Sequence, residues 1–268
     1  VLTRRPVRMR FVPTARAAIT LLILTSCATA PRAETGFLNR TLIHEGRLYR
    51  YVVYVPDHRA GERLPITLFL HGSGERGEDG FRQIEVGLGR AIRWNRDRFP
   101  MIVVLPQAPA GTQWLGEVAD FAMGALDRTI DEFHGDPDRV YLTGLSLGGY
   151  GTWHLAIANP DRFAAIVPVC GGIVKPETAQ NVRQSPLTIG AADPYAFAAD
   201  KVKHLPAWIF HGADDKLIPA SESRRMYEEL RQRGADVRYT EFPDVGHNAW
   251  DPAYGDAELW IWLLGQRR

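Results

Sequence analysis

The sequence predicts an α/β fold, in which helices flank a mostly parallel central sheet. Short apolar runs without polar alternation recur along the chain, which is typical of strands buried on both faces. Segments with apolar residues at helical spacing separate these runs, and such alternation favours parallel strands joined by right-handed crossovers. Composition does not change between residues 41 and 268, so we expect one domain there.

The apolar runs define seven expected strands, of which the first is rich in β-branched and aromatic residues. They cover residues 47–56, 64–70, 101–105, 140–142, 163–169, 207–210 and 237–242. Helical spacing is found in residues 118–134, 147–158, 220–233 and 256–264. Residues 173–203 contain three prolines and interrupt the pattern. They fit equally well a small insertion near the substrate and a plain surface connection.

Composition excludes several classes of protein. The 268 residues are 45% hydrophobic and 24% charged, as in ordinary globular proteins. Two cysteines are too few for a disulfide-stapled mini-domain or a multi-cysteine zinc or iron–sulfur site, and we expect no metal. Five arginines and no acid lie in residues 1–26, so the rest of the chain has 27 basic against 31 acidic residues, or −4. A large nucleic-acid-binding surface is therefore not expected.

The N-terminus has the pattern of an export signal. A basic stretch precedes the apolar residues 17–24, a run too short for the roughly 20 residues that span a bilayer. The segment 24–27, Leu-Thr-Ser-Cys, resembles the lipobox of bacterial lipoproteins, which implies cleavage before Cys27 and its lipidation. We therefore predict a signal peptide over 1–26, a tether over 27–40, and a location on the membrane surface of the bacterial cell envelope. Plain secretion with cleavage at 28–30, or a buried helix, are the alternatives.

A glycine-flanked serine follows one of the expected strands. Residues 144–148 read Gly-Leu-Ser-Leu-Gly, with the strand 140–142 before them and a helical pattern after them. This is the strand–turn–helix context of a nucleophile elbow, where a sharp turn exposes the serine hydroxyl and glycines avoid Cβ clashes. Ser146 is the predicted nucleophile. A glycine-rich turn with an incidental serine is the alternative.

A serine nucleophile needs a histidine base and a carboxylate that orients the histidine. In elbow enzymes the acid and then the histidine follow the serine along the chain. His247 comes after the last expected strand, beside a glycine, and is the predicted base. Asp214 and Asp215 both follow the strand 207–210, and spacing alone does not choose between them.

The negative oxygen of the tetrahedral intermediate needs two N–H donors. We predict Leu147, the residue after the nucleophile, and Ser73, in the loop after the strand 64–70. The same loop contains a Gly-x-Gly-x-x-Gly pattern over 72–77, which raises NAD binding as an alternative. Acidic residues follow instead of a helix, and the next strand ends without an acid for a ribose, so we expect no cofactor.

Taken together, these segments resemble the α/β-hydrolases of the phospholipase/carboxylesterase-like group, also called "predicted peptidases". The resemblance covers about residues 41–268. Its motifs are LHGSGERG (70–77), LPQAPAGTQW (105–114), GLSLGGYGTW (144–153), HGADDKLIP (211–219) and GHNAWDPAY (246–254). It implies an α/β-hydrolase fold and cofactor-free hydrolysis of feruloyl, acetyl or short acyl esters. It also implies that Asp215, the fifth residue of its motif, is the acid.

The sequence thus favours a serine carboxylesterase that forms an acyl-enzyme with a small-molecule or polysaccharide-linked ester. A serine peptidase and a non-catalytic binding lipoprotein are the alternatives. Gln107 and Trp114 follow the strand 101–105, at the strand end where such folds bind ligands, and Trp250 lies just past His247. We expect these three side chains to contact substrate, with packing in the core or rim as the alternative.

Overall fold

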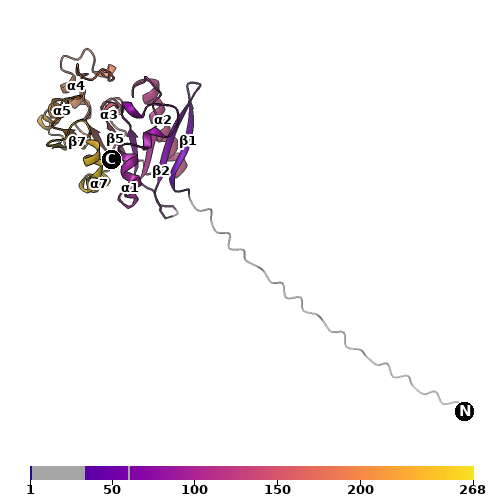
Figure 1. The fold of residues 1–268 in the computed structure, drawn as a ribbon. Coiled ribbons are helices and arrows are strands. Elements are labelled where there is room, and N and C mark those ends of the chain that lie inside the picture. Colours follow the sequence, from indigo (N-terminus) through magenta and orange to yellow (C-terminus); the bar gives the residue numbers. More distant parts are fainter. Residues whose placement is uncertain (2–33, 60) are drawn as a thin grey trace. The chain divides into compact units, whose positions relative to one another are not determined.

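The structure, a computed structural model, describes residue 1 and residues 34–268 except residue 60. Glu34–Arg268 form one compact unit (Figure 1). Residues 2–26 of the predicted signal peptide, Cys27 and residues 28–33 of the predicted tether lie outside the described residues. Among the residues that are described, no helix is long and apolar enough to cross a membrane.

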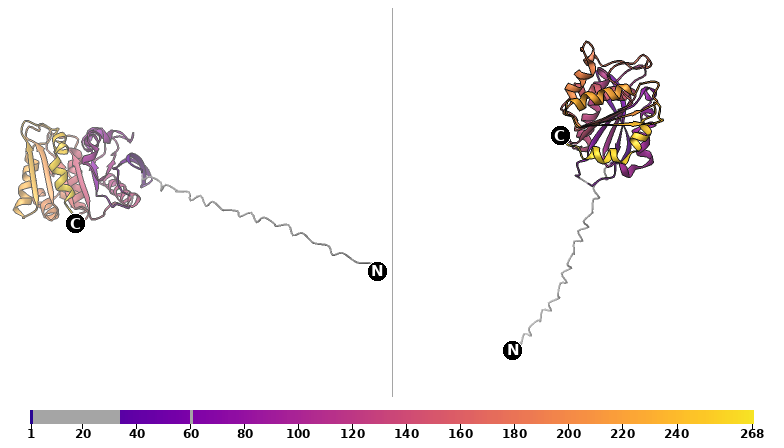
Figure 2. Two further views of the ribbon diagram at one scale, coloured as in Figure 1. Left: turned by 90° about the horizontal axis from the view of Figure 1, so that it is seen from below. Right: turned by 90° about the vertical axis from the view of Figure 1, so that its left-hand side faces the viewer.

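An eight-stranded sheet forms the centre of this unit (Figure 2). The strand order is β1-β2-β4-β3-β5-β6-β7-β8. β1 and β2 pair antiparallel with each other, β2 pairs antiparallel with β4, and all other pairs are parallel. The strands are β1 (Gly36–His44), β2 (Arg47–Val55), β3 (Ile66–Leu70), β4 (Ile102–Pro106), β5 (Val140–Leu145), β6 (Ala165–Val169), β7 (Ala207–Gly212) and β8 (Val237–Phe242). The predicted, mostly parallel α/β fold is confirmed.

β1 was not expected from the sequence. It is an edge strand whose residues alternate between half-buried and exposed, so it lacks the apolar run that marks the buried strands. A tight turn at Glu45 and Gly46, both with positive φ, connects it to β2. Because β1 begins at Gly36, residues 36–40 are part of the sheet, whereas the sequence had placed them in the tether.

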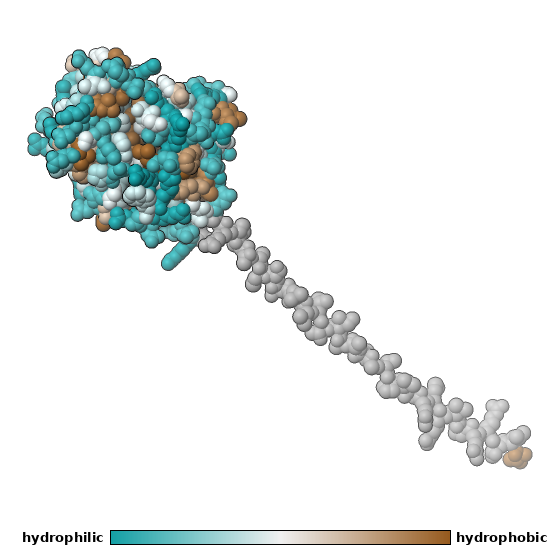
Figure 3. Space-filling model, in the orientation of Figure 1, coloured by the Kyte–Doolittle hydropathy of each residue, from teal (hydrophilic) through white to brown (hydrophobic). Residues whose placement is uncertain are grey.

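Helices cover both faces of the sheet and bury its two apolar layers. One layer packs against α2 (Glu117–Phe133), α3 (Leu147–Ala158), α4 (Pro194–Val202) and α5 (Ser221–Gln232). The other packs against α1 (Leu88–Trp94), α6 (Trp250–Gly255) and α7 (Ala257–Leu264). The short helices α1, α4 and α6 were missed by the sequence interpretation. On the face shown in Figure 3, apolar side chains are scattered among polar ones.

The connection 173–203 contains α4 and is tied to the body of the fold by Glu222 of α5. The buried Glu222 carboxylate accepts hydrogen bonds from the N–H groups of Ile173 and Val174 at 3.2 Å and from the Tyr195 hydroxyl at 2.5 Å. The Tyr150 hydroxyl, in the first turn of α3, donates to the Val174 carbonyl. The start of the connection therefore lies beside the turn that carries Ser146.

Candidate active site

Ser146 occupies a strained turn between β5 and α3. Its φ of 53° and ψ of −116° lie where non-glycine residues are seldom found. The flanking glycines are required by close backbone contacts. A Cβ atom on Gly148 would lie 1.9 Å from the Leu70 carbonyl oxygen, and one on Gly144 would lie 2.3 Å from the Gly148 carbonyl oxygen. Because these contacts are with backbone atoms, a larger residue cannot be accommodated by moving a side chain.

The three predicted triad residues meet at the carboxyl ends of β5, β7 and β8. His247 Nε2 is 2.9 Å from Ser146 Oγ, and His247 Nδ1 is 2.7 Å from Asp215 Oδ2. Both are hydrogen-bond distances, so the side chains form a continuous serine–histidine–carboxylate chain. This is the geometry needed for histidine to take a proton from the serine hydroxyl.

The structure distinguishes the two adjacent aspartates. Asp214 is exposed, whereas Asp215 is buried and its Oδ1 accepts hydrogen bonds from the N–H groups of Leu217 and Ile218 at 2.9 Å. Burial by itself would raise the pKa of Asp215. Hydrogen bonds from His211, His247 and the Ile218 N–H outweigh burial and hold that pKa well below its usual range. Asp215 therefore stays ionised beside His247.

His211 is a supporting residue that the sequence interpretation left without a role. Its fully buried ring lies with Nδ1 2.6 Å from Ser223 Oγ, and with Nε2 2.9 Å from the Ile218 carbonyl and 3.3 Å from Asp215 Oδ2. A carbonyl accepts only, so the Nε2 carries the hydrogen. His211 thereby fixes the loop that presents Asp215. Its signal in the sequence is its place at the end of a buried apolar run, directly before Gly212.

The two expected oxyanion donors are each the first residue of a helical turn. Leu147 begins α3 and Ser73 begins the 3-10 turn Ser73–Glu75, so neither N–H has an acceptor within its own helix. The loop carrying Ser73 also touches the elbow. A Cβ atom on Gly72 would lie 2.8 Å from Leu145 Cδ1 and 3.7 Å from Ser146 Cβ. The positive end of α3 adds to the attraction for a negative oxygen here.

Gln107 holds this loop and uses both ends of its amide to do so. Its Nε2 donates to the Glu75 carbonyl and to Asp79 Oδ1 at 3.1 Å, and its Oε1 accepts from the Gly80 N–H at 2.6 Å. The side chain is 2% exposed. The polar atoms of Gln107 therefore already have partners, and Gln107 positions the loop instead of making the expected contact with substrate.

Arg76 and Glu75 belong to the same loop. The Arg76 guanidinium donates to the carbonyls of Ser73 and Thr112 at 2.9 and 3.1 Å. The Glu75 carboxylate lies within 3.0 Å of the point where a Gly72 Cβ would sit, and burial raises its pKa. The Gly-x-Gly-x-x-Gly segment thus forms an anchored loop with a single 3-10 turn, and α1 begins only at Leu88. In a dinucleotide-binding site, by contrast, a helix begins within this glycine motif.

Trp114 lies in the core, so packing, the alternative to substrate contact, describes its role. It is 1% exposed, and its Nε1 donates to the His71 carbonyl at 2.9 Å. Its ring packs edge-on against the His71 ring, which is itself buried. His71 Nε2 accepts the Ala108 N–H at 3.0 Å, and burial lowers the pKa of His71 to about 4. Trp114 and a neutral His71 therefore support residues 71–77, the loop that carries Ser73 and is called the oxyanion loop below.

Trp250 is the one expected substrate contact that reaches the reacting groups. It is half-buried, and its ring lies edge-on to the His247 ring with centroids 5.5 Å apart.

Among residues 34–59 and 61–268, no group of three His, Cys, Asp or Glu side chains is arranged to hold a metal ion.

Comparison with protein-family models decides the family. Residues 112–263, which include Ser146, Asp215 and His247, match the model of the prolyl oligopeptidase family. The chain belongs to this family. Membership in the prolyl oligopeptidase family, together with the fold, identifies a serine hydrolase of the α/β-hydrolase class.

Relatives of this prolyl oligopeptidase family chain include peptidases and esterases. It is 26% identical to dipeptidyl aminopeptidase BIII of Pseudoxanthomonas mexicana, over 78% of this chain and 34% of the relative. It is 28% identical to a poly(3-hydroxyoctanoate) depolymerase of Pseudomonas fluorescens, over 59% of this chain and 58% of the relative. The crystal structure of a thermostable esterase is similar with a TM-score of 0.71 and 31% identity, over 87% of this chain and 63% of that one. The chain thus spans less than two thirds of each of these proteins.

Proposed function

We propose that this protein is a serine carboxylesterase that hydrolyses short-acyl or aryl esters of the acetyl or feruloyl type. The observation that carries the proposal is the hydrogen-bonded chain from Ser146 through His247 to Asp215 at the elbow. The ester is presented by a small molecule or by a polysaccharide.

The geometry suits an acyl-enzyme mechanism. Ser146 Oγ attacks the carbonyl carbon while His247 Nε2 takes the hydroxyl proton. The N–H groups of Leu147 and Ser73 hold the negative oxygen of the tetrahedral intermediate. His247 then gives the proton to the leaving alcohol, and the ester C–O bond breaks. Water, deprotonated by His247, attacks the acyl-enzyme and releases the acid and free Ser146.

The ionised Asp215 contributes by electrostatics. When His247 is protonated during attack, the adjacent buried carboxylate stabilises the imidazolium and keeps Nε2 aimed at Ser146. Because Asp215 also accepts two backbone hydrogen bonds, it is held in position without needing the histidine. The base is therefore pre-organised before substrate binds.

Ester cleavage is supported by relatives of several kinds. Besides the depolymerase and the thermostable esterase, the chain is 25% identical to a bifunctional acetylxylan esterase/xylanase of Neocallimastix patriciarum over 195 residues. We infer from these that an ester in a polymer or on a sugar is a suitable substrate class. Peptide cleavage is the second candidate, because the family and dipeptidyl aminopeptidase BIII are named as peptidases and the same three residues can cleave amides.

One panel of initial rates tests both candidates, with the Ser146→Ala variant as the blank. It contains p-nitrophenyl acetate, butyrate and octanoate, methyl ferulate, acetylated xylan and an aminoacyl p-nitroanilide. We expect ester turnover that falls by several orders of magnitude in Ser146→Ala. Faster turnover of the anilide than of every ester would favour the peptidase. Equal rates in the variant and the wild type, with no labelling by a fluorophosphonate probe, would favour the third hypothesis, a non-catalytic binding lipoprotein.

We further propose that the enzyme is exported and attached to the cell envelope through a lipidated Cys27. The support is the basic and apolar segment that ends in Leu-Thr-Ser-Cys. Expression in bacteria with labelled palmitate tests it. Wild type and Cys170→Ala should take up label and Cys27→Ala should not, since Cys170 is buried. An unlabelled wild type would instead favour plain secretion.

A further inference from the structure

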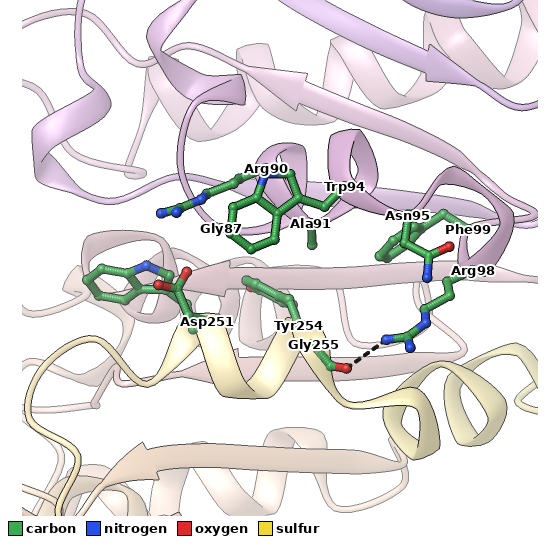
Figure 4. Close-up of a pocket in the computed structure, with 11 residues that line it drawn as sticks. Gly87, Arg90, Ala91, Trp94, Asn95, Arg98, Phe99, Asp251, Tyr254 and Gly255 are labelled. Atoms are coloured by element: carbon green, nitrogen blue, oxygen red, sulfur yellow. Dashed lines mark hydrogen bonds between the residues drawn. The ribbon is translucent and has the colours of Figure 1, made fainter.

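A groove between α1 and α6 opens beside the triad. Its volume is about 390 Å³, within the range of small-molecule binding sites. Figure 4 shows its lining, with Gly87 and Arg90 toward one end and Asn95 and Arg98 toward the other. None of the functional roles described so far accounts for this groove.

Two contacts place one end of the groove next to the reacting groups. Trp250, which lines the groove, touches the ring of His247 edge-on. Gly87, at the start of α1, packs so closely on Leu145 that a Cβ atom would lie 2.5 Å from Leu145 Cδ2. Leu145 directly precedes Ser146 in the chain. A ligand in the groove would therefore extend away from Ser146 and His247 along α1 and α6.

The far end is closed by a polar bridge. Arg98 Nη1 donates to the Gly255 carbonyl at 3.1 Å, which joins the end of α6 to the segment after α1 (Figure 4). Two buried aromatic side chains also line the groove, Phe99 at this end and Tyr254 nearer the middle (Figure 4). The groove is therefore a pocket of limited length, with Trp250, the neighbour of His247, at one end.

The walls combine aromatic faces with hydrogen-bonding groups. Trp94 is 77% exposed, an unusual position for so large an apolar side chain, and Trp250 is half-buried. The Arg90 guanidinium stacks 4.6 Å from the Trp94 ring, and Asp251 accepts from Asn248 at 2.9 Å at the same end as Arg90. Indole faces bind flat rings, while guanidinium and carboxylate groups bind hydroxyls around them.

We propose that this groove binds the pyranose rings of a carbohydrate that carries the scissile ester, a proposal that rests on the proposed esterase function. A pyranose ring has an apolar C–H face that packs on indole and a rim of hydroxyls that both donate and accept. Arg90 offers donors and Asp251 offers acceptors, so both needs are met. A fatty acyl chain, which neither donates nor accepts hydrogen bonds, would make no use of these groups.

Binding can be measured without turnover. Xylotetraose is titrated into the full chain carrying Ser146→Ala, and the dissociation constant is read from tryptophan fluorescence and calorimetry. Adding Trp94→Ala should weaken binding about tenfold, the scale of one lost stacking contact. The matched control is Ile261→Ala, another exposed apolar side chain (74%), which lies on α7 outside the groove and should leave binding unchanged.

Turnover gives a second, independent measurement. Trp94→Ala should lower kcat/KM for acetylated xylo-oligosaccharides about tenfold more than for p-nitrophenyl acetate, mainly through KM. A larger effect on methyl ferulate than on the sugar esters would overturn the proposal in favour of an aromatic acyl pocket. Unchanged xylotetraose binding in Trp94→Ala would also overturn it. If Ser146→Ala keeps full activity, the esterase proposal fails instead, and the binding measurement still tests the groove.

Discussion

The catalytic loops and the groove between α1 and α6 are neighbours, but they are built differently. In the loops, Ser146 and Asp215 are buried, their side chains are hydrogen-bonded, and glycines are imposed by contacts with backbone atoms. In the groove, the wall residues Trp94 and Arg90 are exposed, and the Arg90 guanidinium stacks on the Trp94 ring. The difference indicates that the reaction depends on backbone sterics that tolerate little change. In the proposed substrate groove, by contrast, exposed side chains can change without disturbing the fold.

The strongest test of the loops compares two adjacent aspartates. Asp215→Asn should lower kcat for p-nitrophenyl acetate about a thousandfold or more, because the ionised partner of His247 is lost. Asp214→Asn is the matched control, since Asp214 is exposed and should keep nearly wild-type kcat. Steady-state kinetics of both variants measure the difference. A comparable loss in the two variants would contradict the assignment of Asp215.

A test of intermediate size concerns the buried His71 beneath the oxyanion loop. Its pKa is lowered to about 4 in the folded protein, against an ordinary value near 6.5. The unfolded chain therefore binds more protons between these values, and stability falls as the pH drops from about 6.5 to about 4. The loss should be about 3 kcal/mol in the free energy of unfolding.

Urea unfolding of wild type and His71→Gln at pH 7 and pH 4 measures this effect. The variant lacks the titrating ring, so its stability should change less with pH by about the same 3 kcal/mol. His204→Gln is the control, because His204 is exposed and its loss should leave the pH dependence as in wild type. Parallel curves for wild type and His71→Gln would show that His71 is not held neutral by burial.

The smallest expected effect separates loop positioning from substrate contact. Gln107→Ala removes the hydrogen bonds to Glu75, Asp79 and Gly80, so the oxyanion loop loses part of its support. We expect kcat to fall about tenfold, equally for acetate, butyrate and ferulate esters, with KM little changed. Rates measured across the ester series check this. A rise in KM confined to one ester would instead make Gln107 a substrate contact.

The elbow could be predicted from the sequence because its requirement is local. A strand, a serine between glycines and a helix follow one another within residues 140–158, and the structure forms them as expected. The edge strand β1 and the short helices α1 and α6 could not be predicted in this way. Their residues are half-exposed or too few to show a clear period, and packing against the sheet is what stabilises them.

The sequence by itself determined the α/β class and the identities of Ser146, His247 and the neighbouring aspartates, because apolar periodicity and glycine placement act over a few residues. Spacing left Asp214 and Asp215 open and the family resemblance implied Asp215, but only the tertiary structure places the Asp215 carboxylate against His247. The tertiary structure also turned Gln107 and Trp114 into supports and placed Trp94 and Trp250 in one groove. These outcomes depend on which loops meet at the carboxyl ends of β5, β7 and β8. Contacts between residues more than a hundred positions apart in the chain, such as Ser146 and His247, arise only when the strands assemble into one sheet.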